Sequence, residues 1–335
     1  MTTLSAQLES SHAAHNTAAI VPSLEGVSEA QLTAAFAECQ RITRERARNF
    51  YYGLKLLPEP RRSGVFAIYG WMRQADDCAD EGGDIALRRE ALARFAATTR
   101  AALGGTIDLS TSSMWLALAA TVTSYRLDPR LLLDTLDGLA EDLDHGGYAT
   151  DADLEQYCYR VASTVGLLCV GVWGLRAGLS EAEASRVREL AIARGQAFQL
   201  TNILRDFAGD YDDAPSRVYL SRESFERMGL TPRQLRDWAQ PERCERYVLA
   251  QAQRARDYYL ASADLDKLIA PDCVPTLWAM TRIYSGLLDV IAADPKRVVA
   301  GPRIRLSGVR KTAIALRAMV RSKLAVGGRS APGAR

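Results

Sequence analysis

Apolar residues recur every three to four positions over long stretches of the chain, and sustained alternation of apolar and polar residues is almost absent. The first spacing is typical of amphipathic helices, whereas alternation is typical of half-buried strands. Prolines, which interrupt helices, are absent from 61–128 and 130–214. The pattern predicts an all-α protein with long helices near 61–81, 86–103, 112–126, 130–144, 152–176, 181–208, 242–262 and 272–293.

The distribution of charge indicates three parts of unequal size. Residues 1–40 contain no Lys or Arg, whereas no acid and eleven Lys or Arg residues follow Asp294. With 335 residues, 48% of them hydrophobic, the chain can bury a large core. We expect a loose N-terminal tail over 1–28, one helical domain over 29–306, and a basic C-terminal helix and tail over 307–335.

The composition argues against several classes of partner and site. A net charge of +2 does not favour a nucleic-acid partner. The six cysteines form no CxxC pair and there are only three histidines, so a zinc site is not indicated. The most apolar stretch, 165–175, is too short to span a bilayer. We expect a cytoplasmic protein, and the basic tail leaves peripheral contact with the inner face of the membrane open.

Two acidic clusters stand at the ends of apolar segments. The first, "QADDCADEGG" (74–83), follows "GVFAIYGWM", and the second lies within "GQAFQLTNILRDFAGDYDD" (195–213). Asp76 and Asp80 are four residues apart, as are Asp206 and Asp210, so each pair shares one face of a helix. Like charges at that spacing repel each other, which indicates either a cationic ligand or a solvated helix end.

Spacing alone does not decide whether the acidic rows bind a cation or are solvated helix ends. A single row of charge usually marks an exposed helix face. Two rows, each next to apolar helix and each with a nearby arginine, suit Mg²⁺ ions that hold a diphosphate, because Mg²⁺ takes one or two carboxylates plus water and phosphate oxygens. The apolar helix bodies would then shelter a hydrocarbon chain beside the diphosphate.

Three ordered motifs resemble the squalene/phytoene synthase family over about residues 40–310. They are "LLPEPRRSGVFAIYGWMRQADDCADE" (56–81), "YCYRVASTVG" (157–166) and "GQAFQLTNILRDFAGDYDDAPSRVYL" (195–220). The resemblance implies an isoprenoid-synthase fold, a helical bundle around a central prenyl-binding cavity. It also implies Mg²⁺-dependent head-to-head (1′-1) condensation of two prenyl diphosphates through a cyclopropyl diphosphate.

The resemblance further implies roles for individual residues. As metal ligands for two or three Mg²⁺ ions, with Mn²⁺ as an alternative, it indicates Asp76, Asp77, Asp80, Asn202, Asp206 and Asp210. As catalytic residues it indicates Tyr69, Arg73, Tyr157 and Arg205. As substrate-binding residues it indicates Arg46, Arg48, Phe50, Tyr51, Val161, Ala162, Val165, Gly166, Gln199, Tyr284 and Arg303.

The product and several rival functions stay open. The first segment, "NFYYGLKLLPEPRR", favours two farnesyl diphosphates and a presqualene or squalene-type C30 product, with two geranylgeranyl diphosphates and C40 phytoene as the alternative. NADPH is not indicated, although the NADPH-using relatives also lack a glycine fingerprint. If the reaction stops at the cyclopropyl diphosphate, a downstream isoprenoid enzyme would be a partner. Rival readings are a head-to-tail elongator, a terpene cyclase, or a non-catalytic scaffold of the same fold.

Overall fold

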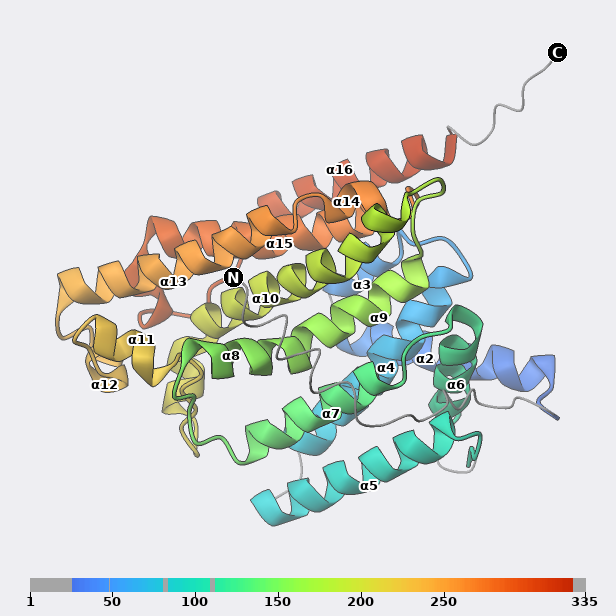
Figure 1. Ribbon diagram of the computed structural model, residues 1–335, viewed down its shortest axis with the longest axis horizontal. Coiled ribbons are helices and arrows are strands. Elements are labelled where there is room, and N and C mark those ends of the chain that lie inside the picture. Colours follow the sequence, from blue (N-terminus) through green and yellow to red (C-terminus); the bar gives the residue numbers. More distant parts are fainter. Residues whose placement is uncertain (1–25, 48, 81–83, 109–111, 328–335) are drawn as a thin grey trace.

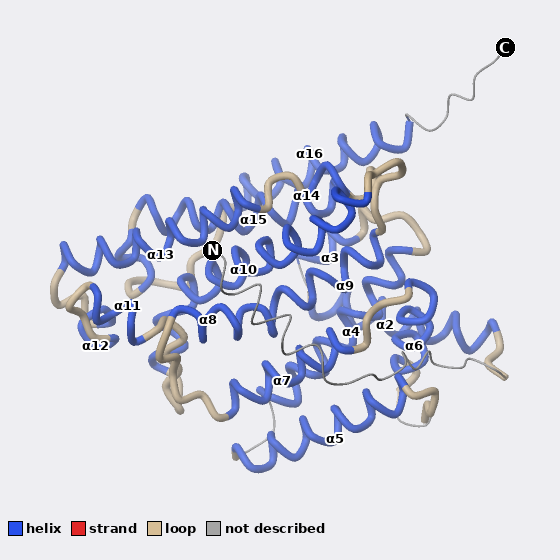
Figure 2. Tube along the Cα trace, in the orientation of Figure 1, coloured by secondary structure: helices blue, strands red, loops and turns tan. Residues whose placement is uncertain are grey.

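The computed structural model describes residues 26–47, 49–80, 84–108 and 112–327. Over these ranges the chain is helical and has no strand, only an isolated bridge between Leu175 and Ile269 (Figures 1 and 2). The predicted all-α class is therefore confirmed.

The elements are α2 (Glu29–Arg46), α3 (Asn49–Leu54), α4 (Arg61–Asp80), α5 (Ile85–Leu103), α6 (Met114–Tyr125), α7 (Arg130–Leu143), α8 (Asp151–Cys158), the π-helix η1 (Tyr159–Ser163), α9 (Thr164–Trp173), α10 (Glu181–Asp212), α11 (Arg222–Arg227), α12 (Pro232–Arg236), α13 (Pro241–Ala261), α14 (Leu265–Leu268), α15 (Val274–Ala293), the 3₁₀ helix η2 (Pro295–Val298) and α16 (Gly308–Gly327).

Helix α10 is the central element of the bundle. It packs against α13 and α15 on one side and against η1 and α9 on the other, and α16 lies beyond α15 (Figure 1). Its N-terminal half supplies Val187 and Leu190 to one core cluster, and its C-terminal half supplies Leu204 and Phe207 to a second. Residues in the middle of the helix, among them Gly195, Phe198 and Gln199, line a pocket.

Local sequence explains the start and the length of α10. Ser180 caps the first turn and forms a capping box with Glu183, which satisfies backbone N–H groups that have no partner within the helix. With 32 residues the helix is roughly 48 Å long. It continues to Asp212, beyond the predicted end at 208, so Asp206 and Asp210 both stand on its last turns.

The predicted single helix over 152–176 is interrupted by the π-helix η1. Close approach of two neighbouring helices accompanies this wide turn. A Cβ atom added to Gly195 of α10 would lie 2.5 Å from Ser163 Cα, and one added to Gly138 of α7 would lie 2.7 Å from Val161 Cγ1. The Ser163 hydroxyl also donates to the Ile192 carbonyl of α10 at 2.9 Å. The two glycines thus let α7 and α10 hold η1 between them.

The structure adds short or weakly patterned helices that the periodicity did not predict: α2, α3, α11, α12 and α14. In α2 the buried positions are largely small or polar, among them Ala35, Cys39 and Thr43, so its apolar stripe is faint in the sequence.

The predicted tail up to residue 25 lies outside the described residues. None of the helices within the described ranges combines the length and apolarity needed to cross a bilayer.

Candidate active site

Two pockets of different character meet at the middle of α10. The apolar pocket has a volume of about 560 Å³, and the polar pocket has a volume of about 900 Å³. Gln199 and Asn202, one helical turn apart on α10, line both pockets. A ligand with a charged end and a hydrocarbon end could therefore place one end in each pocket.

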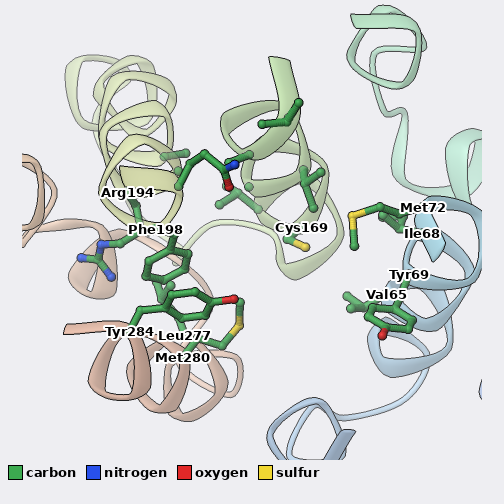
Figure 3. A pocket seen from close by; sticks show the side chains of 18 of the residues that line it. Val65, Ile68, Tyr69, Met72, Cys169, Arg194, Phe198, Leu277, Met280 and Tyr284 are labelled. Carbon is green, nitrogen blue, oxygen red and sulfur yellow. The ribbon is translucent and has the colours of Figure 1, made fainter. Parts of the chain in front are cut away.

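Helices from both sides of the bundle form the apolar pocket. Figure 3 shows α4 presenting Val65, Ile68, Tyr69 and Met72 toward Phe198 of α10 and Tyr284 of α15. The rings of Phe198 and Tyr284 are stacked with centroids 4.6 Å apart. Between these walls, η1 and α9 contribute four of the residues that the sequence predicted to bind substrate: Val161, Ala162, Val165 and Gly166. Arg46 and Arg303 also line this pocket.

The polar pocket is rich in acids. Asp76 and Asp80 reach it from α4, and Asp206 and Asp210 reach it from α10, so the two acidic rows predicted from the sequence share one space. Among the described residues its lining holds seven carboxylates and three arginines: Asp76, Asp80, Asp84, Asp142, Asp206, Asp210, Asp213, Arg88, Arg205 and Arg217. This excess of negative charge favours cations, and only with bound cations could the pocket also accept a diphosphate.

The pKa values of these acids reflect their crowding. Burial, reinforced by the charge of Asp80, raises the pKa of Asp76 to about 7. Burial and the neighbouring Asp206 raise the pKa of Asp210 to about 6. Burial alone would raise the pKa of Asp206 as well, but hydrogen bonds from Arg205 and Arg303 outweigh it and hold this pKa below its ordinary value. Carboxylates held so close together would be stabilised by a divalent cation.

The donor set fits Mg²⁺ shared with a phosphate ligand. Across the described part of the chain, no three Asp, Glu, His or Cys side chains come together closely enough to hold a metal ion. Mg²⁺ does not require such a cage, because it usually keeps waters and takes one or two carboxylates plus substrate phosphates. In addition, Asn202 lines this pocket, and its buried Oδ1 accepts no hydrogen bond from any described residue, so one further oxygen acceptor is available at this site.

Asp77 does not join the acidic pocket. Its carboxylate accepts from Arg46 at 2.8 Å and pairs with Arg73 one turn earlier on α4. Neighbouring residues on a helix point about 100° apart, so the adjacent Asp76 faces the polar pocket while Asp77 turns toward α2. In this structure Asp77 therefore holds two arginines, and its role as a metal ligand stays a prediction. Arg73, which the sequence analysis expected to be catalytic, is absent from the described linings of both pockets.

Tyr157 is buried at the edge of the polar pocket with a partner that the sequence did not suggest. Its hydroxyl donates to Asp142 of α7 at 2.9 Å, and its ring stacks on Tyr219 with centroids 5.2 Å apart. Burial and the neighbouring Asp142 raise the pKa of Tyr157 well above its ordinary value. The phenol therefore stays protonated at neutral pH and is suited to donate a hydrogen bond rather than to accept a proton.

Six charged or aromatic residues of the polar pocket were missed: Asp84, Arg88, Asp142, Asp213, Arg217 and Tyr219. The last two lie in the "RVYL" segment that ends the second motif, so a signal was present but was not converted into roles. Asp142 stands among the ordinary acids of an amphipathic helix, and no sequence feature marks it. Burial raises its pKa to about 7.

A few predicted residues lie elsewhere. The side chain of Tyr51 is buried in the core against Phe66, with ring centroids 5.7 Å apart, and contributes to neither lining within the described residues. Stacking on Phe66 gives Tyr51 a packing contact, and its role as a substrate contact stays a prediction. Arg48 and the side chain of Phe50 lie outside the described residues.

Known proteins are similar to this chain over most of its length. The squalene/phytoene synthase family profile matches residues 43–310. The chain is 31% identical over 277 residues to the 15-cis-phytoene synthase of Synechococcus elongatus, covering 81% of this chain and 88% of that protein. It is 33% identical over 300 residues to the phytoene synthase of Mycobacterium tuberculosis, covering 87% and 93%.

Solved structures of similar fold include two synthases of C30 products. A dehydrosqualene synthase has a TM-score of 0.72 at 25% identity and covers 88% of this chain and 99% of that one. The squalene synthase of Alicyclobacillus acidocaldarius has a TM-score of 0.69 at 25% identity and covers 79% and 96%. The bundle is therefore an isoprenoid-synthase fold, and the chain belongs to the squalene/phytoene synthase family, whose members are prenyltransferases that join two prenyl diphosphates head to head.

Proposed function

We propose that this protein condenses two geranylgeranyl diphosphates to the C40 hydrocarbon phytoene through a cyclopropyl diphosphate. The observation that carries the reaction class is the junction of an acidic pocket and an apolar pocket at Gln199 and Asn202. The choice of the C20 substrate rests on the relatives named phytoene synthase at 31–34% identity over most of the chain.

Binding would divide the substrate between the two pockets. Asp76, Asp80, Asp206, Asp210 and Asn202 would hold Mg²⁺ ions, which neutralise the diphosphates and stabilise the negative charge that develops on a leaving diphosphate. The prenyl chains would lie against η1, α9 and the aromatic wall of the apolar pocket. Burial of the chains there excludes water from the reacting carbons.

The first half-reaction begins with ionisation of the donor. Its C1–O bond breaks, and the electron pair leaves with the diphosphate, which Arg205 and Arg303 help to hold. The C2=C3 electrons of the acceptor then attack the allylic C1. Loss of a proton closes the cyclopropane ring, and the released diphosphate takes this proton because the raised pKa of Tyr157 leaves its phenol protonated.

The second half-reaction would ionise the cyclopropyl diphosphate and rearrange it to the linear product. The carbocation formed needs a dry site with electron-rich faces rather than nucleophiles. Tyr69, Phe198 and Tyr284 present aromatic rings to the apolar pocket (Figure 3), and such rings stabilise cations through their π-electrons. Loss of a second proton, to the diphosphate released in this second ionisation, would complete the reaction without a redox partner.

Two farnesyl diphosphates and a C30 product form the second candidate. The specific observation in its favour is the similarity at 25% identity to solved dehydrosqualene and squalene synthases. A squalene product would also require a reductant, whereas phytoene and dehydrosqualene would not.

A product assay tests the proposal. Purified protein receives Mg²⁺ and either labelled geranylgeranyl or labelled farnesyl diphosphate, with and without NADPH, and products are identified by mass spectrometry after phosphatase treatment. A C40 hydrocarbon from the C20 substrate alone is the expected result. A C30 product in place of it would move the assignment to the squalene branch, and accumulation of the cyclopropyl alcohol would assign the second half-reaction to another enzyme. Failure to consume either substrate would overturn the reaction itself.

A further inference from the structure

Helix α16 carries apolar side chains on two opposite faces. Its inner face buries Ile314 and Ala318, 8% and 0% exposed, where the helix packs on α15 and α3. Its outer face carries a stripe of four apolar residues. Successive members are four, three and four residues apart, which places them on one side of the helix. This stripe consists of Val309, Ala313, Leu316 and Val320.

The outer stripe is unusually exposed for apolar residues. Val309, Leu316 and Val320 are 83%, 57% and 58% exposed, and the adjacent Met319 is 48% exposed. Four of the eight exposed large apolar side chains among the described residues thus lie on this one helix. Single exposed apolar residues are ordinary, but such a concentration marks an interaction surface.

Positive charge flanks the stripe. Arg310, Arg317 and Arg321 are seven and four residues apart and so share one side of α16, which contains no acid. They border a groove of about 750 Å³ between α15 and α16, to which Arg282 also contributes.

Nearby acids offset only part of this charge. Asp289 of α15 lies in the groove and pairs with Arg310 at 3.0 Å. Asp266 of α14 lies near Arg321 but pairs with the buried Arg194 at 3.4 Å. The guanidinium of Arg321 stacks over Trp278 at 4.4 Å from the ring centroid, which holds its charge at the groove.

We propose that this outer face, the α16 surface, binds the anionic surface of a lipid bilayer, with the helix lying along the membrane rather than crossing it. The α16 surface is Val309, Ala313, Leu316 and Val320 with the flanking Arg310, Arg317 and Arg321. An apolar stripe beside basic residues is the pattern of helices at the membrane interface, because the stripe enters the acyl boundary while arginine stems extend to the phosphates.

The charge pattern argues for a bilayer over a second copy of the chain. A two-fold dimer through this face would bring the same patch of each copy together. The arginines of one copy would then face those of the other, with few acids to offset them, and like charges at an interface repel. A bilayer of anionic lipids offers the opposite charge and an apolar interior at once.

The position of the α16 surface gives the contact a use, and this use rests on the proposed function. Helix α15 directs Leu277, Met280 and Tyr284 into the apolar pocket and Trp278 and Arg282 into the groove beside α16. The α16 surface is therefore one helix away from the prenyl pocket. Prenyl diphosphates and a long hydrocarbon product both partition into membranes, so docking here would shorten their path.

Vesicle co-sedimentation of the full chain tests the proposal, and it requires no turnover. Binding is measured to vesicles of phosphatidylcholine alone and of phosphatidylcholine with roughly a third phosphatidylglycerol, at low salt and at about 0.5 M salt. The key variant is Leu316→Ser, and its matched control is Leu87→Ser on α5, which has 54% exposure and lies at the opposite edge of the bundle (Figure 1). A second variant, Arg317→Glu, has Arg100→Glu on α5 as its matched control.

We expect the wild type to bind anionic vesicles at low salt. Its binding to phosphatidylcholine vesicles, and its binding to anionic vesicles at about 0.5 M salt, should each be weaker by roughly ten-fold or more. Leu316→Ser and Arg317→Glu should each weaken binding roughly ten-fold, whereas the two α5 controls should bind as the wild type does. Equal binding by Leu316→Ser and Leu87→Ser would overturn the proposal. So would a wild-type dimer in light scattering that Leu316→Ser converts to a monomer, because the α16 surface would then be a subunit contact. Neither result would bear on the condensation reaction, which the product assay tests separately.

Discussion

Arg303 holds the carboxylate of Asp206 through two hydrogen bonds, from Nε to Oδ1 at 2.6 Å and from Nη2 to Oδ2 at 2.7 Å. Arg205 pairs with the same carboxylate from its own helix. A proposed metal ligand is thus paired with two guanidinium groups. Because the side chain of Arg303 is 57% exposed and also lines the apolar pocket, it is placed to exchange Asp206 for a phosphate.

Replacing Arg303 should separate metal binding from substrate binding. In Arg303→Gln, Mg²⁺ no longer competes with this guanidinium, and we expect the substrate-free protein to bind Mg²⁺ about ten-fold more tightly. The same variant should raise KM for the prenyl diphosphate, because a phosphate contact is lost. Isothermal titration and steady-state kinetics measure the two effects, with Arg305→Gln, at a neighbouring exposed position, as control. Weaker Mg²⁺ binding in Arg303→Gln would contradict the expected exchange.

Asp77 and Asp80 provide a test of which acids face the metal. Asp80→Asn should lower kcat by about 100-fold or more, because a carboxylate that supports the leaving diphosphate is lost. Asp77→Asn should lower kcat less than about ten-fold and act mainly on KM, since Asp77 positions Arg46 and Arg73. The two single variants are compared at saturating Mg²⁺. Equal losses of kcat would support Asp77 as a metal ligand.

Gly195 should be intolerant of any side chain, although it lies within a helix. A Cβ atom there would lie 2.5 Å from Ser163 Cα and 2.7 Å from Ser163 N, and both are backbone atoms that cannot rotate away. We expect Gly195→Ala to lower the free energy of unfolding by about 1–3 kcal/mol. A Cβ atom added to Gly209 on the same helix would meet no neighbouring element within 4 Å, so Gly209→Ala should be neutral or stabilising by up to about 1 kcal/mol. Unfolding in urea measures the free energy of unfolding of both variants. Similar midpoints for the two would show that the close contact between Gly195 and Ser163 does not make a side chain at 195 destabilising.

The metal-free protein should become less stable as pH rises from about 4 to about 7. Burial raises the folded-state pKa of Asp76 and Asp142 to about 7 from an ordinary value of 3.8. Between these values the unfolded chain has released protons that the folded chain still holds, so the free energy of unfolding falls with increasing pH. Asp206 contributes in the opposite direction, but only below about pH 4, because its pKa is lowered.

Asp142→Asn should flatten this pH dependence and stabilise the protein at pH 8 by about 1–3 kcal/mol, since the amide keeps an acceptor for Tyr157 without a charge. Unfolding in urea at several pH values, with a chelator present, measures the slope. Asp137→Asn, at an exposed position on the same helix, is the matched control and should keep the wild-type slope. An unchanged slope in Asp142→Asn would remove Asp142 as a source of the effect.

Helical spacing was sufficient to predict each acidic row, but not that the two rows lie together. Asp76 with Asp80 and Asp206 with Asp210 each share a helix face, and the resemblance indicated that the two faces meet. It could not decide between the adjacent Asp76 and Asp77, because that choice depends on Arg46, which arrives from a different helix. Spacing along one helix predicts what shares a face, but not what the neighbouring helix presents to it.

Asp142 and η1 show the limit of sequence analysis more clearly. Asp142 belongs to α7, whose acids look like those of any solvated helix, and only packing places it under Tyr157. The residues 152–176 form one continuous apolar pattern, and nothing in it marks a π-turn. That turn is accompanied by glycines on two other helices, Gly138 of α7 against Val161 and Gly195 of α10 against Ser163, far from it in the sequence.

The π-turn makes chain length, as well as residue identity, a determinant of the cavity. Its hydrogen-bonding pattern accommodates one residue more than an α-helical turn of the same span. Deleting one residue within 159–163 would therefore restore regular α-helix while leaving α8 and α9 in nearly the same phase. Tyr157 would keep its place over Asp142, and the segment of Val165 and Gly166 would still face the apolar pocket, but the widened turn that carries Val161 and Ala162 would be lost. The segment can therefore change its side chains or its extra residue to reshape the cavity wall without uncoupling that wall from the acidic pocket.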